Sequence, residues 1–428
     1  MPEKSYFPIL RYSRRGISLP VLRNGVVPDL SVAIVGFGPT GHFTLREIAN
    51  FAATNPNTNI KVNLFDPKGF DGRGIHTRPE NKSDKITAAS RQLVLNTSAD
   101  GTFSAYDIRN GYHFPAFAAR NGFSPQDFLP RYLLGDFMAM RTDELFTRAD
   151  NLPNLDIQKH QRRAEKLCDV EKPIERYDHV FCCTGHTRMP SADHLTDFSG
   201  FYKNLFYLPE ANDIYHRQGN ADHTLVIPGG FTSSMDAVRM AENLDYRGKY
   251  TLICRSGFLQ PEIDNERVRA VPAWQLYDAL NRAGRMEVIS DRTDMQQVSY
   301  HARDKVFEIP LSGGGVITAA NLCNAAIWSD SVMPQDHDGQ IMTDTLMQSI
   351  YMNTGLDMGD NGTWRDFHAV EEGISALGSA LNNPGGNPWA MRACSDMCRA
   401  EVTNILCGVL NAKEQKPKEM HRHALVVA

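Results

Sequence analysis

The chain has 428 residues, which is enough for two or three domains with a sizeable buried core. Its formal net charge of -5 gives no reason to expect a nucleic acid or an anionic membrane as a partner. The longest apolar runs, such as residues 205–208 and 424–428, are too short to span a bilayer, and no secretory leader pattern opens the chain. We therefore expect a soluble, cytoplasmic protein.

Eight cysteines are scattered along the sequence, which argues against a disulfide framework in a chain of this size. Cys182 and Cys183 are adjacent in an expected buried strand, where they would behave as small hydrophobic residues. Cys394 and Cys398 lie one helical turn apart. A metal or redox pair is one interpretation, but the spacing is not C-x-x-C, so packing thiols are favoured.

Residues 1–27 are basic and irregular and predict an extension that packs on the body or orders an oligomer contact. From residue 28 onward, strand and helix patterns alternate, which is typical of a parallel sheet covered on both faces. The charged stretch 413–422 near the end of the chain is expected to fray.

The most informative segment is residues 31–41, where an apolar β-branched run ends in Gly-Phe-Gly-Pro-Thr-Gly and a helical pattern follows. Gly36 permits a tight turn, Gly38 leaves no Cβ between the backbone and a phosphate, and Gly41 lets the helix pack closely on the strand. Free N–H groups at the helix start and the positive end of its dipole would meet the phosphates. The segment predicts a dinucleotide site.

Asp66 ends the next predicted strand, residues 61–66, where its carboxylate could accept both hydroxyls of an adenosine ribose. An acid at this position would repel a 2'-phosphate. The first site therefore suits FAD or NAD rather than NADP.

A second strand, turn and helix follow at residues 224–243, with a further strand at 250–255. Two such units predict a flavoprotein that binds two dinucleotides. The second turn allows two alignments. In one, Gly229 is the first glycine and Phe231 falls where the second glycine belongs, so that a phenyl group would obstruct a pyrophosphate. In the other, the turn has an extra residue, with Pro228 first and Gly230 at the close approach.

From residue 30 to about 385 the chain resembles the FAD/NAD(P)-binding flavoproteins related to the class B flavin monooxygenases. Besides the Gly36–Gly41 turn, the segments that carry this resemblance are residues 70–76, 93–98, 128–136, 178–186, 338–344 and 356–360. The resemblance implies an α/β fold of two Rossmann-like domains, the second inserted in the first. The expected domains are 28–204 with 331–428 for FAD, and 205–330 for NAD(P)H.

The resemblance also implies site residues, with FAD and NADPH as the cofactors. For FAD they are Gly36, Gly38, Pro39, Thr40, Gly41, Asp66, Gly74, Asn96, Arg131, Thr184, Gly185, Gly359 and Asp360. For NADPH they are Gly229, Gly230, Ser233 and Arg255. Two alternatives stay open from the residues alone: Gly359-Asp360 also suits a surface turn, though a helix pattern at 367–381 follows it as in the family, and Arg255 also suits a surface strand end.

The expected activity is an NADPH-dependent monooxygenation of a small metabolite, with N-hydroxylation favoured, through a flavin C4a-hydroperoxide. The flavin would carry the redox step. Asn96 is the candidate for contact with the isoalloxazine ring, while His76, His113 and His186 are candidate acids or bases that also suit structural roles. A flavin oxidase or dehydrogenase reduced directly by substrate, and a non-catalytic FAD-binding protein, are the alternatives.

Overall fold

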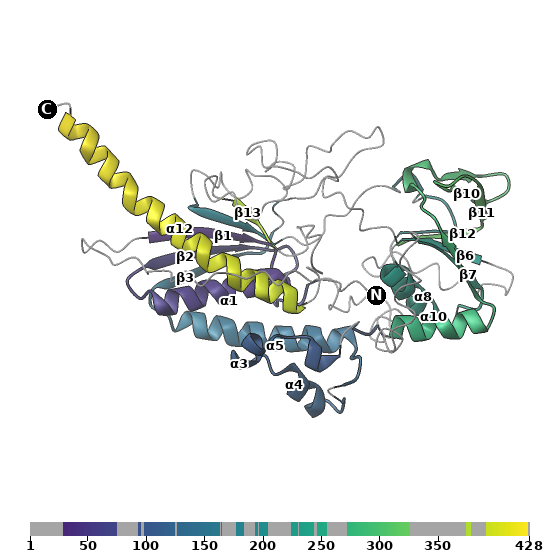
Figure 1. Ribbon diagram of the computed structural model, residues 1–428, viewed down its shortest axis with the longest axis horizontal. Helices are drawn as coiled ribbons and strands as arrows, with labels where there is room; N and C mark the ends of the chain where they lie inside the picture. Colours follow the sequence, from purple (N-terminus) through teal and green to yellow (C-terminus); the bar gives the residue numbers. More distant parts are fainter. Residues whose placement is uncertain are drawn as a thin grey trace, which may run out of the picture. The chain divides into compact units, whose positions relative to one another are not determined.

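The computed structural model describes residues 29–74, 93–95, 98–124, 126–162, 164, 177–183, 193–195, 197–203, 224–229, 231–243, 246–254, 272–325, 374–377 and 391–426 (Figure 1). The chain forms two compact units. Unit 1 comprises Met1–Gly72, Met140–Gly185 and Asp344–Ala428, and unit 2 comprises Arg73–Ala139 and His186–Thr343.

Unit 1 is built on a parallel five-stranded sheet in the order β13-β4-β1-β2-β3. Its strands are β1 (Asp29–Val35), β2 (Asn59–Phe65), β3 (Leu155–His160), β4 (His179–Cys182) and β13 (Ile374–Ala376). Central β1 is almost wholly apolar, and residues 32–35 are at most 2% exposed, as expected of a parallel strand covered on both faces. Val35 pairs with Phe65 on one side and Cys182 on the other, so the carboxyl ends of the three strands are level.

Three helices accompany this sheet: α1 (Pro39–Thr54), α5 (Arg131–Asp150), of which residues 140–150 belong to unit 1, and α12 (Met391–Val426). Helices α1 and α12 pack side by side (Figure 1), and the thiols of Cys394 and Cys398 lie against Thr40 and Thr44 of α1. Both cysteines are reduced and buried, and burial raises their pKa values, so they stay protonated and act as packing thiols, as predicted.

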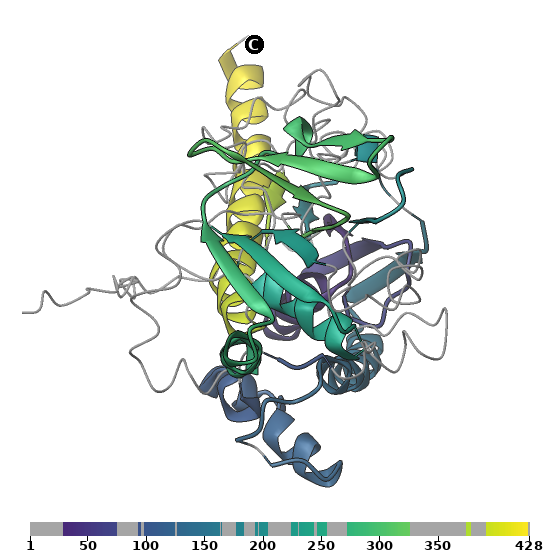
Figure 2. The same ribbon diagram turned by 90° about the vertical axis from the view of Figure 1, so that its right-hand side faces the viewer.

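Unit 2 has a second parallel sheet in the order β5-β12-β6-β7-β8. The strands are β5 (Phe201–Lys203), β6 (Thr224–Pro228), β7 (Lys249–Cys254), β8 (Met286–Ser290) and β12 (Asn321–Asn324). Helices α8 (Phe231–Asn243) and α10 (Pro272–Arg282) lie on one face, and an antiparallel sheet of β9 (Ser299–His301), β10 (Val306–Pro310) and β11 (Val316–Ala319) lies on the other (Figures 1 and 2).

The alternation of side chains along β6 explains these three layers. Leu225 and Ile227 enter the core shared with α8 and α10, whereas Val226 between them enters the core shared with Phe307 and Ile309 of β10. Successive side chains of a strand point to opposite faces, so a strand buried on both sides is apolar at every position.

Shorter elements complete unit 2. They are η1 (Ala99–Gly101), α3 (Ala105–Arg109), α4 (Phe114–Arg120), η3 (Asp193–Leu195) and η5 (Met295–Gln297). Ser104 and Asp107 form a capping box at the start of α3. Phe103, Phe114 of α4 and Phe137 of α5 pack as an aromatic cluster, with ring centroids 5.2 to 6.0 Å apart.

The two parallel sheets, each with a strand-turn-helix-strand unit, confirm the predicted α/β fold class. The predicted helix at 367–381 is wrong in its described part. Residues 374–376 form β13, which pairs with Val180–Cys182 and completes the sheet edge. Helix α12 continues to Val426, through the charged stretch 413–422, whose expected fraying stays a prediction. The predicted domain boundaries at 204/205 and 330/331 lie outside the described residues and remain predictions.

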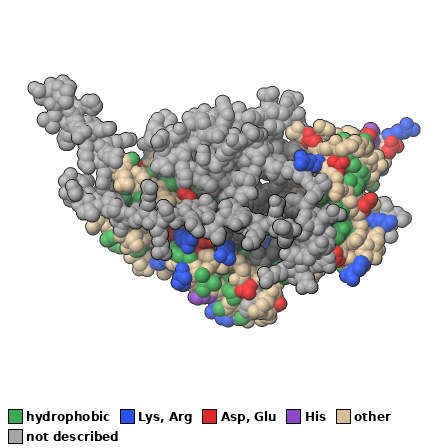
Figure 3. Space-filling view, viewed as in Figure 1, with side chains coloured by type: hydrophobic (Ala, Val, Ile, Leu, Met, Phe, Trp, Pro, Cys, Tyr) green, Lys and Arg blue, Asp and Glu red, His purple; other side chains and the backbone are tan. Residues whose placement is uncertain are grey.

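None of the helices in the described part of the chain has the length and apolar character needed to cross a membrane. On the face drawn in Figure 3, Lys and Arg side chains are interspersed with Asp and Glu side chains over the described residues. This mixture agrees with the modest net charge of -5.

Two glycines of unit 2 provide a matched test of its packing. Gly200 and Gly284 have φ values of +95° and +65°, but a Cβ on Gly200 would lie 2.3 Å from the carbonyl oxygen of Ala320, whereas one on Gly284 would meet nothing within 4 Å. We expect Gly284→Ala to lower stability by about 1–2 kcal/mol, the left-handed backbone cost alone. Gly200→Ala should cost clearly more, because β5 must move from β12. Thermal unfolding of both variants measures the difference, and equal losses would contradict it.

Candidate functional site

The turn between β1 and α1 has the geometry that its glycines predict. Gly36 has a φ of +90°, and its N–H donates to the carbonyl oxygen of Phe65 at 2.8 Å. A Cβ on Gly41 would lie 2.2 Å from the carbonyl oxygen of Gly36. The first turn of α1 therefore packs on the strand end at a distance that only glycine allows.

Gly38 is the N-cap of α1, with φ -77° and ψ -162°, and Pro39 follows in the first turn. The cap forms no side-chain hydrogen bond, and the first turn has no acidic residue. No carboxylate of this turn therefore neutralises the positive end of the helix, which is the environment that binds a pyrophosphate. The backbone conformation of Gly38 suits any residue, so the reason for glycine is the room it leaves at the helix end.

Phe37 anchors this turn. Its ring is 1% exposed and packs against Phe70 and Phe146, with centroids 5.8 and 5.6 Å away. Sequence reasoning missed this role, although a large apolar residue between two glycines was a signal that could have indicated it. The buried ring fixes the loop, while the flanking Gly36 and Gly38 are only partly buried.

Asp66 is half-buried beyond the end of β2 and ties two loops together. One carboxylate oxygen accepts the N–H of Phe37 at 2.7 Å, and the other accepts the N–H of Lys68 at 2.7 Å. A carboxylate has about four acceptor sites, so these two bonds leave capacity for ribose hydroxyls. The predicted ribose contact stays a prediction, and the structure adds that Asp66 holds the glycine turn.

His42 lies in the second half of the first α1 turn and was also missed at the sequence level. It is fully buried, and its Nδ1 lies 2.8 Å from the hydroxyl of Thr142 on α5. Gly72, with φ +71°, lets the loop after β2 pack here, because a Cβ would lie 2.3 Å from that hydroxyl. Burial, together with the positive charges of Arg46 and Arg141, holds the pKa of His42 well below its ordinary value, so the ring is neutral.

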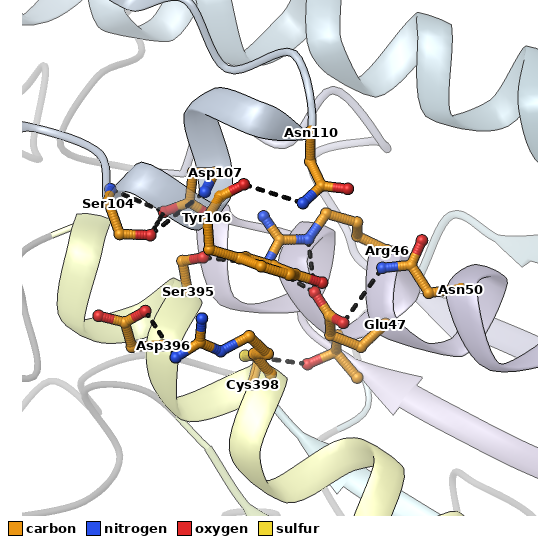
Figure 4. A network of polar contacts seen from close by, with 12 residues as sticks. Arg46, Glu47, Asn50, Ser104, Tyr106, Asp107, Asn110, Ser395, Asp396 and Cys398 are labelled. Carbon is orange, nitrogen blue, oxygen red and sulfur yellow. Dashed lines mark hydrogen bonds and ion pairs between the residues drawn. The ribbon is translucent and has the colours of Figure 1, made fainter.

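One turn further along α1, an ion pair lies inside unit 1 (Figure 4). Arg46 and Glu47 are 2% and 3% exposed and meet at 2.6 Å. Arg46 also donates to the hydroxyl of Ser395 on α12 at 3.0 Å, and Glu47 accepts from Asn50 at 3.2 Å. Buried charges need such partners, so this network fixes α12 on the helix that begins at the candidate phosphate site.

The second turn lies between β6 and α8, and its strand side matches the first alignment considered above. Pro228 pairs with Ile253, and the N–H of Gly229 donates to the carbonyl oxygen of Ile253 at 3.1 Å, as Gly36 does to Phe65 in unit 1. Helix α8 begins at Phe231, two residues after Gly229, whereas α1 begins three residues after Gly36. Counted from the strand register, Phe231 corresponds to Gly38; counted from the helix start, Gly230 does, so both alignments remain predictions.

Many of the predicted site residues lie outside the described residues: His76, Asn96, Thr184, Gly185, His186, Gly230, Arg255, Gly359 and Asp360. Ser233 lies in α8, but its side chain is not described. Gly74 has a φ of +66°, and His113 is exposed at the N-cap of α4. Among the residues that the structure does describe, no cluster of three or more His, Cys, Asp or Glu could hold a metal ion.

Arg131, predicted to contact FAD, lies at the start of α5 and forms an ion pair with Asp236 of α8. Its Nε also donates to the carbonyl oxygen of Val94 at 3.0 Å. Both partners belong, like Arg131, to unit 2. Two donors of the Arg131 guanidinium, Nε and a terminal nitrogen, are therefore bonded to protein groups.

Comparison with known proteins gives a match for the part of the chain that contains the β1–α1 turn. Residues 33–187 match the family model of FAD-NAD(P)-binding proteins. They contain the glycine turn, Asp66 and β4, so this part of the chain is similar to FAD-NAD(P)-binding proteins. A search of curated proteins found no match.

Solved structures that match this chain include reduced CoADR-RHD from Bacillus anthracis, with 17% identity, a TM-score of 0.43, and coverage of 89% of this chain and 57% of that one. The lysine monooxygenase NbtG from Nocardia farcinica has 11% identity, a TM-score of 0.49, and coverage of 86% and 99%. The NAD-dependent persulfide reductase from A. fulgidus has 15% identity, a TM-score of 0.46, and coverage of 88% and 59%. The chain thus spans less than two thirds of the length of two of these structures.

Gly38→Ala tests the site directly. We expect the variant to fold with the wild-type circular dichroism spectrum, because alanine adopts the backbone angles of Gly38. It should lose FAD, since the added methyl group occupies the approach to the helix end. Absorbance of the purified protein measures flavin occupancy, and a fully yellow variant would overturn the assignment.

His42 predicts a pH-dependent loss of stability. The unfolded chain binds a proton at His42 below about pH 6.5, while the folded chain does not, so stability falls as the pH drops below that value. The contribution reaches about 1.4 kcal/mol per pH unit. Unfolding in urea at pH 7.5, 6.5 and 5.5 should give a flatter profile for His42→Asn than for the wild type. Thr142→Ser, which keeps the hydroxyl, should retain the wild-type slope; a matching slope in His42→Asn would refute the assignment.

Proposed function

We propose that the protein is an FAD-dependent oxidoreductase. The observation that carries this proposal is the β1-α1-β2 unit, in which Gly36 and Gly41 bring an uncapped helix end against the strand and Asp66 lies beside it. The match of residues 33–187 to FAD-NAD(P)-binding proteins supports it. The carboxylate of Asp66 favours a dinucleotide whose adenosine ribose has free hydroxyls, such as FAD.

We propose more specifically that NADPH reduces the flavin and that the protein oxygenates a small metabolite, with a nitrogen atom as the favoured acceptor. Bound FAD would supply the redox chemistry, and the protein would supply position, electrostatics and exclusion of water. The α1 end would hold the pyrophosphate, Asp66 the ribose, and Asn96 the flavin ring. Arg255 would pair with the 2'-phosphate of NADPH.

A second candidate is a flavin oxidase or dehydrogenase that takes its hydride directly from the substrate. The strand register favours it, because counting from Gly229 aligns Phe231 with Gly38, where a residue larger than glycine would obstruct a second pyrophosphate. In that case unit 2 would keep the nucleotide-binding architecture without a second coenzyme.

An anaerobic visible spectrum of the purified protein, before and after addition of NADPH or NADH, distinguishes these functions. Bleaching of the flavin band by NADPH, faster than by NADH, is the result expected of the monooxygenase, and Arg255→Ala should then remove the preference for NADPH. A yellow protein that neither coenzyme reduces would overturn the NADPH-dependent function in favour of direct reduction by substrate. A colourless protein that does not take up FAD would overturn both.

A further inference from the structure

The first turns of α12 contact the first two turns of α1 through hydroxyl and thiol groups. The hydroxyl of Thr40 lies 3.6 Å from the Sγ of Cys394. The hydroxyl of Thr44, one turn further along α1, lies 3.6 Å from the Sγ of Cys398. The Cys398 thiol also donates to the backbone carbonyl oxygen of Thr40 at 3.7 Å. The buried side of the helix turn that follows Gly38 is therefore in contact with α12.

The same contact extends to the end of the sheet. The hydroxyl of Thr44 also lies 3.5 Å from the Sγ of Cys183, the residue that follows β4. The backbone N–H of Cys183 donates to the carbonyl oxygen of Val35 at 2.7 Å. Val35 is the last residue of β1 and directly precedes Gly36. Helix α12 is thus connected, through Thr44 and Cys183, to the strand end from which the glycine turn starts.

A buried guanidinium adds a third contact between the two helices. Arg46 of α1 donates to the hydroxyl of Ser395 on α12 at 3.0 Å (Figure 4). Both residues are buried. A buried cationic donor needs acceptors from the protein, because water cannot replace them. Removal of the Ser395 hydroxyl would therefore weaken the docked position of the α12 start relative to an opened one.

We propose that Cys394, Ser395 and Cys398 are positioning residues for the candidate phosphate site, and that the docking of α12 on α1 and the binding of FAD stabilise each other. The contacts between the helices belong to unit 1 alone. The coupling to FAD rests on the function proposed above. A pyrophosphate would bind the N–H groups of the first α1 turn, so a ligand that needs this turn in place makes opening of the α12 start rarer. Linkage requires the reverse effect as well.

Thiol labelling of the purified full chain with iodoacetamide, with and without FAD, tests this coupling. Burial raises the pKa values of Cys394 and Cys398, so these thiols react only when the structure around them opens. At a FAD concentration tenfold above the dissociation constant, we expect their labelling to slow by about tenfold. Mass spectrometry of the peptides gives the rate at each cysteine.

Cys407 is the internal control for this experiment, because it is buried further along the same helix. FAD should slow its labelling clearly less than that of Cys394 and Cys398. Equal protection at all three thiols would mean that FAD only lowers global unfolding, which would overturn the proposal. No protection at Cys394 and Cys398 in a protein that binds FAD would overturn it too.

Ser395→Ala tests the positioning role from the side of α12. Without FAD, labelling of Cys394 and Cys398 should accelerate by about tenfold, because a donor of the Arg46 guanidinium loses its acceptor on α12. The dissociation constant of FAD should rise by about fivefold, since the free turn is no longer held in the binding conformation. Faster labelling with an unchanged dissociation constant would restrict Ser395 to packing and overturn its positioning role.

Asp396→Asn is the matched control at the neighbouring position. Asp396 forms ion pairs within α12, with Arg392 at 3.9 Å and Arg399 at 3.5 Å, and all three side chains are exposed. Such exposed pairs contribute little to stability. Neither thiol labelling nor the dissociation constant of FAD should therefore change. Equal changes in Ser395→Ala and Asp396→Asn would refer the effect to the stability of the helix itself and contradict the proposal.

Thr44→Val keeps the test decisive if Ser395→Ala does not fold. Valine has a similar shape to threonine but lacks the hydroxyl between Cys183 and Cys398, so labelling of both thiols should accelerate. Unchanged labelling would refute the contact between the helices as a determinant of docking. Because labelling without FAD reports on docking alone, a wild-type protein that takes up no FAD would instead refute the proposed function.

Discussion

The close approach of α1 to the end of β1 is the constraint on which the first unit depends. The carbonyl oxygen of Gly36 lies where a side chain on Gly41 would stand, 2.2 Å from a Cβ, so the helix can begin there only on glycine. Three contacts hold the same turn: the N–H of Gly36 donates to the carbonyl of Phe65, the N–H of Phe37 donates to Asp66, and the ring of Phe37 packs on Phe146. The backbone at this helix end is therefore fixed in place, so the proposed binding of a phosphate-sized anion would need no further ordering of the turn.

Unit 2 repeats this architecture with one residue fewer in its turn. The ladder bond from Gly229 to Ile253 corresponds to that from Gly36 to Phe65, but α8 starts at once with Phe231. Gly229 is itself required by a close approach, since a Cβ there would lie 2.6 Å from the backbone of Ala325. Gly229 therefore serves the packing between β6 and β12, whether or not unit 2 binds a coenzyme. Two turns of similar sequence thus satisfy different constraints.

Buried charge connects helices to their surroundings in both units. Arg46 and Glu47 secure α12 on α1, and Arg131 and Asp236 secure the 93–95 segment on α8. His42 contributes in the opposite way: it is buried among cations and remains neutral, so it can contact Thr142 without adding charge beneath the glycine turn. Pairing and neutrality are two solutions to the same desolvation cost, and each specifies a contact between elements that hydrophobic packing alone would leave less defined.

The sequence by itself determined strands β1, β2, β6 and β7, the glycine turn after β1 and Asp66, because these depend on local backbone geometry: a positive φ, an apolar run, an acid at a strand end. It could not determine what Arg131 binds, since Asp236 is 105 residues away and only the fold brings the two together. For the same reason, the local pattern predicted a helix at residues 374–376, which form a strand because they pair with β4. Tertiary structure decided these points because hydrogen bonds and charges are satisfied by neighbours in space, which local sequence patterns do not specify.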